Sequence, residues 1–280
     1  MHTSQADETI QYSKTFKNFQ QGYLMKSINL YGYATSPYVR KTACFLYYKG
    51  LDFTHVPVNP IKTKATIGHT NGTQVPVLEI DGEWRRESSD HAHWLDEIFP
   101  EKPLYPLEHQ QKIDQIDDWI SHKYLPSLFR GAIDGPFDRN FIKRSWRLAA
   151  LVNAQTPLPF YIRFIWPFGL RRARFINDMS QHIDFSLSIK DMYMQLFMEL
   201  LEHIGDGPFM GELEKPTMLD FAVFPQLVFG YMFGLEEQLS AAKHPTIKAW
   251  LARVSEHLPE NPLLASDKMQ VNSLKEALSN

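Results

Sequence analysis

The spacing of apolar residues changes once along the chain, near residue 100. Before this point, short runs rich in β-branched and aromatic residues alternate with short helical patterns. The runs predict strands over residues 28–33, 53–58 and 75–80. Beyond residue 107, long helical patterns dominate and strand signals nearly vanish. We therefore expect an α/β domain followed by an all-helical domain.

The first predicted helix lies between the first two strands and carries clear signals at both ends. Ser36 suits the N-cap position, and Pro37 suits the first helical position, where its missing N–H is not needed. Gly50 is placed to end the helix. A right-handed crossover through this helix would make the two flanking strands parallel.

The second half of the α/β region has the order of a hairpin followed by a helix. Residues 59–74 leave room only for a short, poorly defined helix, and Asp81-Gly82 is a two-residue hairpin signal after the third strand. A serine, Ser88 or Ser89, is expected to cap the next helix. The resulting order, βαβ, a loose helix and then ββα, is that of a thioredoxin-like fold.

These patterns divide the chain into four parts. Residues 1–26 form an N-terminal extension, 27–100 the thioredoxin-like domain, 101–107 a proline-punctuated linker and 108–280 the helical domain.

Composition narrows the classes of function. A net charge of −3 gives no general attraction to nucleic acid, and 44% hydrophobic residues allow a sizeable core. Cys44 is the single cysteine, so neither an intrachain disulfide nor a cysteine-based zinc site can form, and no metal site is expected. No apolar run reaches the ~18 residues of a membrane span, and the polar N-terminus does not resemble a secretory signal. We expect a cytoplasmic protein with no transmembrane segment.

Several short motifs, taken in order, resemble those of the glutathione S-transferase superfamily. The resemblance covers roughly residues 28–257, with a poorly matched middle from 131 to 181. Its motifs are Ser36-Pro37-Tyr38, Val75-Pro76, Glu87-Ser88, Pro208-Phe209-Met210-Gly211, Thr217 with Asp220 at capping-box spacing, and the helix start at His244-Pro245.

The resemblance implies that glutathione is a co-substrate of the thioredoxin-like domain. Val75, before a cis Pro76, would pair with the cysteinyl backbone, while Glu87 would meet the γ-glutamyl ammonium and Ser88 the γ-glutamyl carboxylate. Ser36 would stabilise the thiolate as a hydrogen-bond donor, and is therefore the expected catalytic residue. Tyr38 belongs to the expected substrate-binding set.

Other assignments stay open at this stage. Alternative thiol-contacting residues are Tyr31, Tyr33 and Thr35. The run that often precedes Val-Pro in the family is absent here, so the contact to the glycyl carboxylate is not defined, with Gln74, Lys62 and Lys64 as candidates.

The function implied is a glutathione-dependent transferase that acts on a small hydrophobic electrophile and forms a homodimer. The alternatives are a non-catalytic binding or assembly module, or a glutathione-dependent reductase or dehalogenase. The segment 131–181, with its aromatic residues and arginines, is interpreted as a lid, a dimer contact, an acidic-ligand or membrane-surface patch, or a packed insertion.

Overall fold

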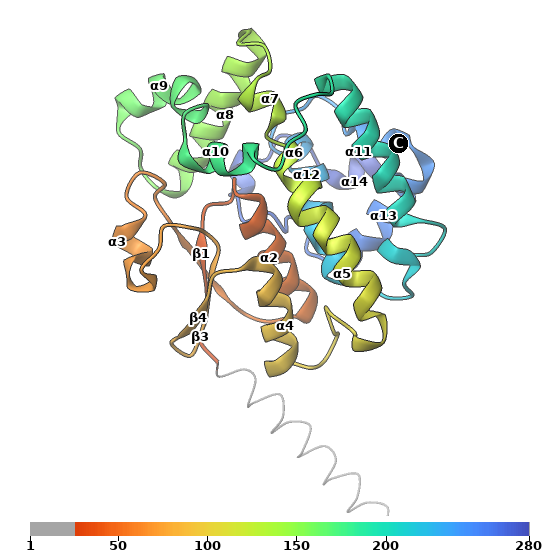
Figure 1. The fold of residues 1–280 in the computed structure, drawn as a ribbon. Helices are drawn as coiled ribbons and strands as arrows, with labels where there is room; N and C mark the ends of the chain where they lie inside the picture. The colour runs from red at the N-terminus through yellow and green to blue at the C-terminus, as the bar shows by residue number, and fades with distance from the viewer. Residues whose placement is uncertain (1–25, 280) are drawn as a thin grey trace, which may run out of the picture.

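The computed structural model describes residues 26–279 and consists of a small α/β domain beside a larger helical domain (Figure 1). The predicted extension over residues 1–26 therefore lies outside the described residues, apart from Lys26. The elements of the α/β domain are β1 (Ile28–Gly32), α2 (Pro37–Lys49), β2 (Thr54–Pro57), α3 (Lys64–Ile67), η1 (Gly68–Thr70), β3 (Val77–Ile80), β4 (Glu83–Arg85) and α4 (Ser88–Ile98).

The four strands form one mixed sheet in the order β2-β1-β3-β4. β1 runs parallel to β2, with Asn29 opposite Thr54, as the predicted crossover requires. β3 is antiparallel to both β1 and β4. The predicted thioredoxin-like order is confirmed, although each observed strand is one or two residues shorter than its sequence run.

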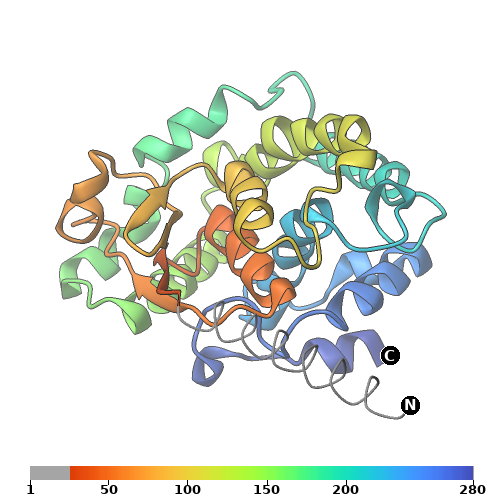
Figure 2. The same cartoon turned by 90° about the horizontal axis from the view of Figure 1, so that it is seen from below.

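The two faces of the sheet are covered differently. α2 and α4 lie together on one face, while α3 lies on the other (Figures 1 and 2). Gly32 faces α2 so closely that a Cβ there would clash with a methyl group of Val39. Leu30 and Leu78 belong to the same core as Cys44, whose thiol is fully buried and has its pKa raised by that burial. Cys44 is thus a packed thiol.

The helix starts agree with the sequence prediction at α2 and differ from it at α4. Ser36 occupies the N-cap position of α2, although its hydroxyl makes no capping hydrogen bond, and Gly50 ends the helix with a φ of 70°. At α4 the N-cap is Glu87, so the prediction of Ser88 or Ser89 was wrong. The Ser89 hydroxyl is instead used inside the protein, where it donates to Asp117.

His91, on the second turn of α4, is a packed histidine. Its ring nitrogens contact the Thr42 hydroxyl and the Arg85 carbonyl oxygen at 3.0 Å each. Burial lowers its pKa to about 4, so the ring is neutral near pH 7.

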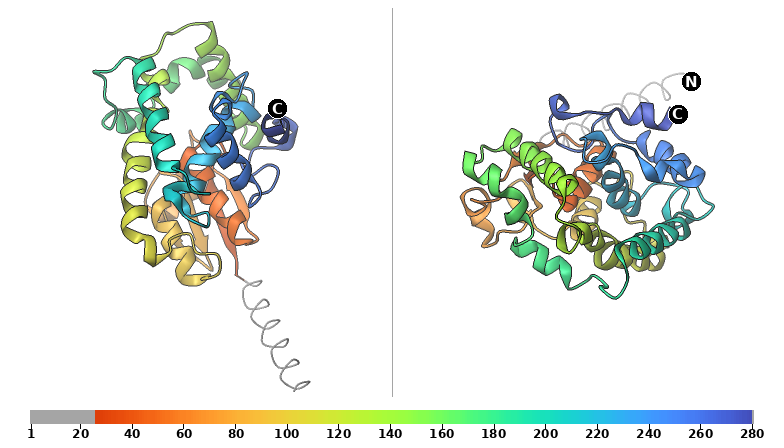
Figure 3. Two further views of the ribbon diagram at one scale, coloured as in Figure 1. Left: turned by 90° about the vertical axis from the view of Figure 1, so that its right-hand side faces the viewer. Right: turned by 90° about the horizontal axis from the view of Figure 1, so that it is seen from above.

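The helical domain covers one end of the α/β domain and extends along α2 and α4 (Figure 3). Its elements are η2 (Leu107–His109), α5 (Gln110–Trp119), the π-helical η3 (Ile120–Tyr124), α6 (Leu125–Ser127), α7 (Arg130–Ile133), α8 (Arg139–Gln155), α9 (Phe160–Leu170), α10 (Arg174–Ser180), α11 (Ile189–Ile204), η4 (Met210–Glu212), α12 (Met218–Met232), η5 (Ser240–Lys243), α13 (Pro245–Ser255), η6 (Asp267–Met269) and α14 (Leu274–Ser279). Between residues 26 and 279, no helix has both the length and the apolar character needed to cross a membrane.

The buried helix α12 packs against α2 and is organised by Asp220. As predicted, Thr217 and Asp220 stand at the N-cap and N3 positions. The Asp220 carboxylate accepts hydrogen bonds from the amides of Thr217 and Met210 and from the indole of Trp250, at 2.7–2.9 Å. Burial raises its pKa to about 6, against the opposing effect of these donors.

Candidate functional site

Strand pairing brings three predicted motifs to the same end of the sheet. β1 and β3 are antiparallel with Tyr31 opposite Val77, so the end of β1 that leads to Ser36 lies beside the start of β3. β4 is antiparallel to β3 with Arg85 opposite Leu78, which directs the chain back to that end before α4 begins. The order of motifs along the sequence thus becomes a cluster in space.

The peptide bond between Val75 and Pro76 in this cluster is cis. Pro76 is buried and Val75 is half-buried at the entry to β3. Val75 and Pro76 come before the point where β3 begins to pair with its neighbouring strands. The backbone groups of Val75 are therefore candidates for hydrogen bonds to an added extended peptide.

The N-terminus of α4 forms the second part of the candidate site. Ser88 is its first residue and is nearly buried, whereas Glu87 is exposed. First-turn amides have no partner inside a helix, so this position favours an anion such as a carboxylate. Burial, and to a lesser extent the charge of Glu87, raise the pKa of Tyr38, on the first turn of α2, to about 12.

Ser36 lies where the third part of the site is expected. Its side chain is nearly buried at the start of α2, and its amide donates to the Tyr33 carbonyl oxygen at 2.9 Å. Because the hydroxyl is not spent on capping α2, it is available to donate to a bound group.

Arg40, which sequence reasoning missed, lies behind this loop. Its guanidinium is buried, donates to the Ala34 carbonyl oxygen at 3.0 Å and to the Gln226 side chain at 2.6 Å, and stacks on Phe229. Among the described residues, no carboxylate forms an ion pair with it. Burial lowers its pKa to about 9, so it stays positively charged near pH 7. An arginine one turn into α2 gave no signal in the sequence, because its side-chain partners Gln226 and Phe229 come from the distant helix α12.

The alternative thiol contacts occupy different surroundings. Tyr31 and Tyr33 pack with Ile67 on the face of the sheet opposite α2, and the Tyr31 hydroxyl donates to Glu79 at 3.3 Å. Burial raises the pKa of Tyr33. Thr35 is half-buried in the turn before Ser36. Of these alternatives, Thr35 lies nearest to Ser36 along the chain.

One further cation, contributed by the residue after β4, lies against the loop before Val75. The sequence candidates Gln74, Lys62 and Lys64 are all exposed. Arg86 was missed, and its guanidinium lies directly against Gly72 in this loop. Its position immediately before Glu87-Ser88 is the signal that could have pointed to it.

The helical domain contacts the candidate site through the end of α8, the segment that follows it, and α10. Gln155, the last residue of α8, accepts a hydrogen bond from the Ala34 amide at 3.0 Å. The Asn59 side chain donates to the Pro157 carbonyl oxygen, and the Tyr38 hydroxyl contacts the Met179 sulfur at 3.4 Å. The poorly matched middle of the chain is therefore docked beside the loop that carries Ser36.

Residues 30–103 match the family described as glutathione S-transferase, N-terminal domain. Prostaglandin E synthase 2 from Mus musculus is 21% identical over 287 residues, which cover 84% of this chain and 71% of that protein.

Two solved structures show the same fold. A glutathione S-transferase from Rhodospirillum rubrum superposes with a TM-score of 0.58 at 17% identity, covering 89% of this chain and 98% of its own. A glutathione transferase homolog from Drosophila mojavensis, with bound glutathione, gives a TM-score of 0.50 at 18% identity, covering 82% and 87%.

The fold and the clustered motifs define a protein with a thioredoxin-like domain followed by a helical domain. Residues 30–103 match a glutathione S-transferase N-terminal domain. The chain as a whole shares the fold of a solved glutathione S-transferase.

Proposed function

We propose that this protein is a glutathione-dependent transferase that activates the glutathione thiol for attack on a small hydrophobic electrophile. The observation that carries the proposal is the meeting of Ser36, Val75-Pro76 and Glu87-Ser88 at one end of the sheet. A homolog with this fold contains bound glutathione, which supports the choice of ligand.

The donor set of the site fits the ionic groups of the tripeptide. Glutathione supplies the thiol nucleophile. Ser88 and the amides of the first turn of α4 would bind the γ-glutamyl carboxylate, and the exposed Glu87 would pair with the γ-glutamyl ammonium. The Val75 backbone would hydrogen-bond to the cysteinyl unit in the manner of an added strand.

Ser36 would lower the pKa of the bound thiol. Its uncommitted hydroxyl would donate to the sulfur, and the N-terminus of α2 would add a favourable dipole. The buried guanidinium of Arg40 donates to the carbonyl oxygen of Ala34, two residues before Ser36. We therefore assign Arg40 a role in positioning the loop that carries Ser36. Ser36 itself is not a nucleophile in this scheme.

Calorimetry with glutathione tests the proposal. We expect Ser88→Ala to weaken binding about tenfold or more, because a hydrogen bond to a charged group is lost. Ser36→Ala should leave the affinity nearly unchanged while lowering the ultraviolet absorbance of the thiolate at neutral pH. Ser188→Ala, which changes a serine at the start of the distant helix α11, is the matched control and should bind as the wild type does.

No detectable wild-type binding at millimolar glutathione would exclude the transferase and leave the non-catalytic module. An unchanged thiolate signal in Ser36→Ala would move the thiol contact to Thr35, Tyr31 or Tyr33.

Arg86 is our candidate for the contact with the glycyl carboxylate. We expect Arg86→Gln to weaken glutathione binding about tenfold, since a charge-assisted hydrogen bond is removed. Binding of γ-glutamylcysteine, which lacks the glycine, should be unaffected. Arg85→Gln is the matched control, because Arg85 lies over Trp94 and near Glu97 instead. Equal losses for both peptides would show that Arg86 does not contact the glycyl unit.

Two properties complete the proposal. We infer a homodimer, from the resemblance to the glutathione S-transferase superfamily, and a cytoplasmic location, from the single buried cysteine. Sedimentation of the full chain tests the first.

A further inference from the structure

One stretch of the helical domain has a charge pattern unlike that of the rest of the chain. Residues 139–177 contain no Asp or Glu and eight Lys or Arg, in a protein whose net charge is −3. The basic residues are Arg139, Lys143, Arg144, Arg147, Arg163, Arg171, Arg172 and Arg174.

Helix α9, in this stretch, exposes an apolar face. The exposed fractions are 74% for Phe160, 68% for Phe164 and 60% for Phe168, three residues spaced four apart along one side of the helix. Tyr161 and Ile165, each next to one of them, are 55% and 51% exposed. A helix on the surface of a soluble domain normally turns this face inward.

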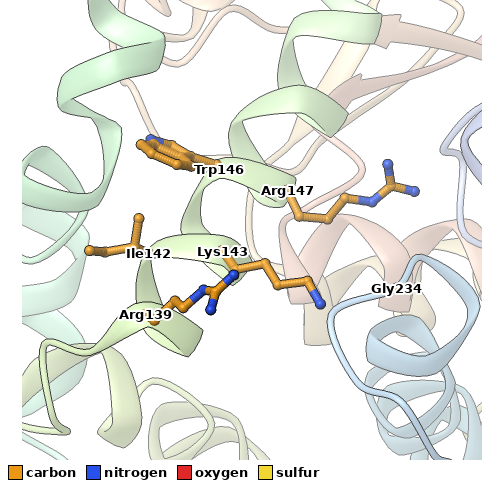
Figure 4. Close-up of a pocket in the computed structure, with 6 residues that line it drawn as sticks. All are labelled: Arg139, Ile142, Lys143, Trp146, Arg147 and Gly234. Atoms are coloured by element: carbon orange, nitrogen blue, oxygen red, sulfur yellow. The ribbon is translucent and has the colours of Figure 1, made fainter.

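The neighbouring helix α8 extends the same surface, which lies at the periphery of the helical domain (Figure 1). Trp146 is half exposed, and together with Phe160, Phe164 and Arg163 it lines a hollow of about 360 Å³. A second hollow, of about 490 Å³, shares Trp146 in its lining and also includes Arg139, Lys143 and Arg147 of α8 (Figure 4).

In Figure 4, Lys143 and Arg147 extend toward the loop at Gly234, while Trp146 projects to the opposite side. Neither hollow is lined by Ser36, Val75 or Ser88. The surface is therefore separate from the candidate glutathione site.

We propose that this α8–α9 surface docks the protein onto an anionic lipid bilayer. The aromatic face of α9 would enter the boundary between headgroups and acyl chains, and the exposed Lys143, Arg163 and Arg172 would face the anionic headgroups. α9 has 11 residues, so it lies in the surface of the bilayer and does not span it.

Charge favours a bilayer over a second copy of the chain as the occupant. A symmetric dimer through this surface would place two basic patches against each other, which is electrostatically unfavourable. An anionic bilayer instead offers opposite charge and an apolar layer at the same depth as the rings.

Vesicle flotation of the full chain tests the proposal. We expect binding to vesicles of phosphatidylcholine with phosphatidylglycerol, weaker binding to phosphatidylcholine alone, and weaker binding at high salt. Removing three exposed rings in Phe160→Ser/Phe164→Ser/Phe168→Ser should lower the partition coefficient about a hundredfold or more. Lys143→Gln/Arg163→Gln should lower it roughly tenfold or more on the anionic vesicles.

The control changes exposed apolar residues elsewhere, in Leu107→Ser/Met194→Ser/Met198→Ser, which should bind vesicles as the wild type does. Glutathione binding, measured in parallel, reports whether each variant is folded. The proposal is overturned if the wild type does not float with anionic vesicles, or if the control loses as much binding as the α9 variant. It is also overturned if the α9 substitutions convert a wild-type dimer to a monomer while vesicle binding persists.

Discussion

Replacing Asp220 by alanine is expected to lower the free energy of unfolding by about 3 to 5 kcal/mol, the largest single effect we predict. Three buried donors lose their acceptor at once: the amides of Thr217 and Met210 and the indole of Trp250. None of them gains water in exchange, because Asp220 and its surroundings are fully buried. The loss is larger than for an ordinary helix cap, which contributes about 1 kcal/mol.

Urea unfolding followed by circular dichroism measures this effect. Asp191 offers a matched control, since it also occupies the third position of a helix, α11, but pairs with Ser188 at the surface. Asp191→Ala should cost no more than about 1 kcal/mol. Asp220→Asn keeps an acceptor for two of the donors and should fall between the two alanine variants. Similar losses for Asp220→Ala and Asp191→Ala would contradict the role we give to the buried carboxylate.

Removing Asp117 is expected to have the second largest effect, about 3 kcal/mol or more. Lys41 on α2 is fully buried and donates to Asp117 on α5 at 3.0 Å and to the Ser89 hydroxyl on α4 at 2.9 Å. Asp117→Ala would leave the lysine charge buried without a carboxylate. Because the network joins the α/β domain to the helical domain, both should lose stability together.

A second variant separates the stranded charge from simple loss of packing. Lys41→Met/Asp117→Ala removes both charges and should recover most of the lost stability, since a buried ion pair can be replaced by apolar groups at little cost. Asp118→Ala is the control on the same helix, because Asp118 is exposed and pairs only with His122. Its effect should stay within about 1 kcal/mol. A double variant as unstable as Asp117→Ala would show that the buried charge is not the cause.

Local patterns predicted the elements of the α/β domain well because their signals are short-range. Pro37 and Gly50 mark the two ends of α2 by backbone preference alone, and Asp81-Gly82 marks the hairpin. The N-cap of α4 is Glu87, one or two residues before the predicted serines. The hydroxyl of Ser89, a good capping residue by type, is engaged by Lys41 and Asp117. Such tertiary competition for a side chain has no local signature.

The candidate site shows the same division. Ser36, Val75, Pro76, Glu87 and Ser88 were selected from motifs in sequence order, and strand pairing brings them to one end of the sheet. Arg40 and Arg86 were not selected, since isolated arginines are usually solvated. The contact of Arg40 with Gln226 and that of Arg86 with Gly72 arise only when separate elements of the chain meet.

The segment from 131 to 181 shows most clearly what sequence patterns leave open. The aromatic residues and arginines between Phe160 and Arg174 were compatible with a lid, a dimer contact, an acidic-ligand or membrane-surface patch, or a packed insertion. The tertiary structure docks Gln155 and Pro157 beside the site and leaves Phe160, Phe164 and Phe168 exposed.

The sequence by itself determined the order of strands and helices and the change from an α/β pattern to a helical pattern. It also carried the motifs that resemble those of the glutathione S-transferase superfamily. These features could be predicted because backbone preferences and apolar spacing act over a few residues. Only the tertiary structure decided which apolar faces are buried, which cations lie behind the Ser36 loop and which surface stays open to a partner, because burial depends on the packing of elements that the chain brings together from a distance.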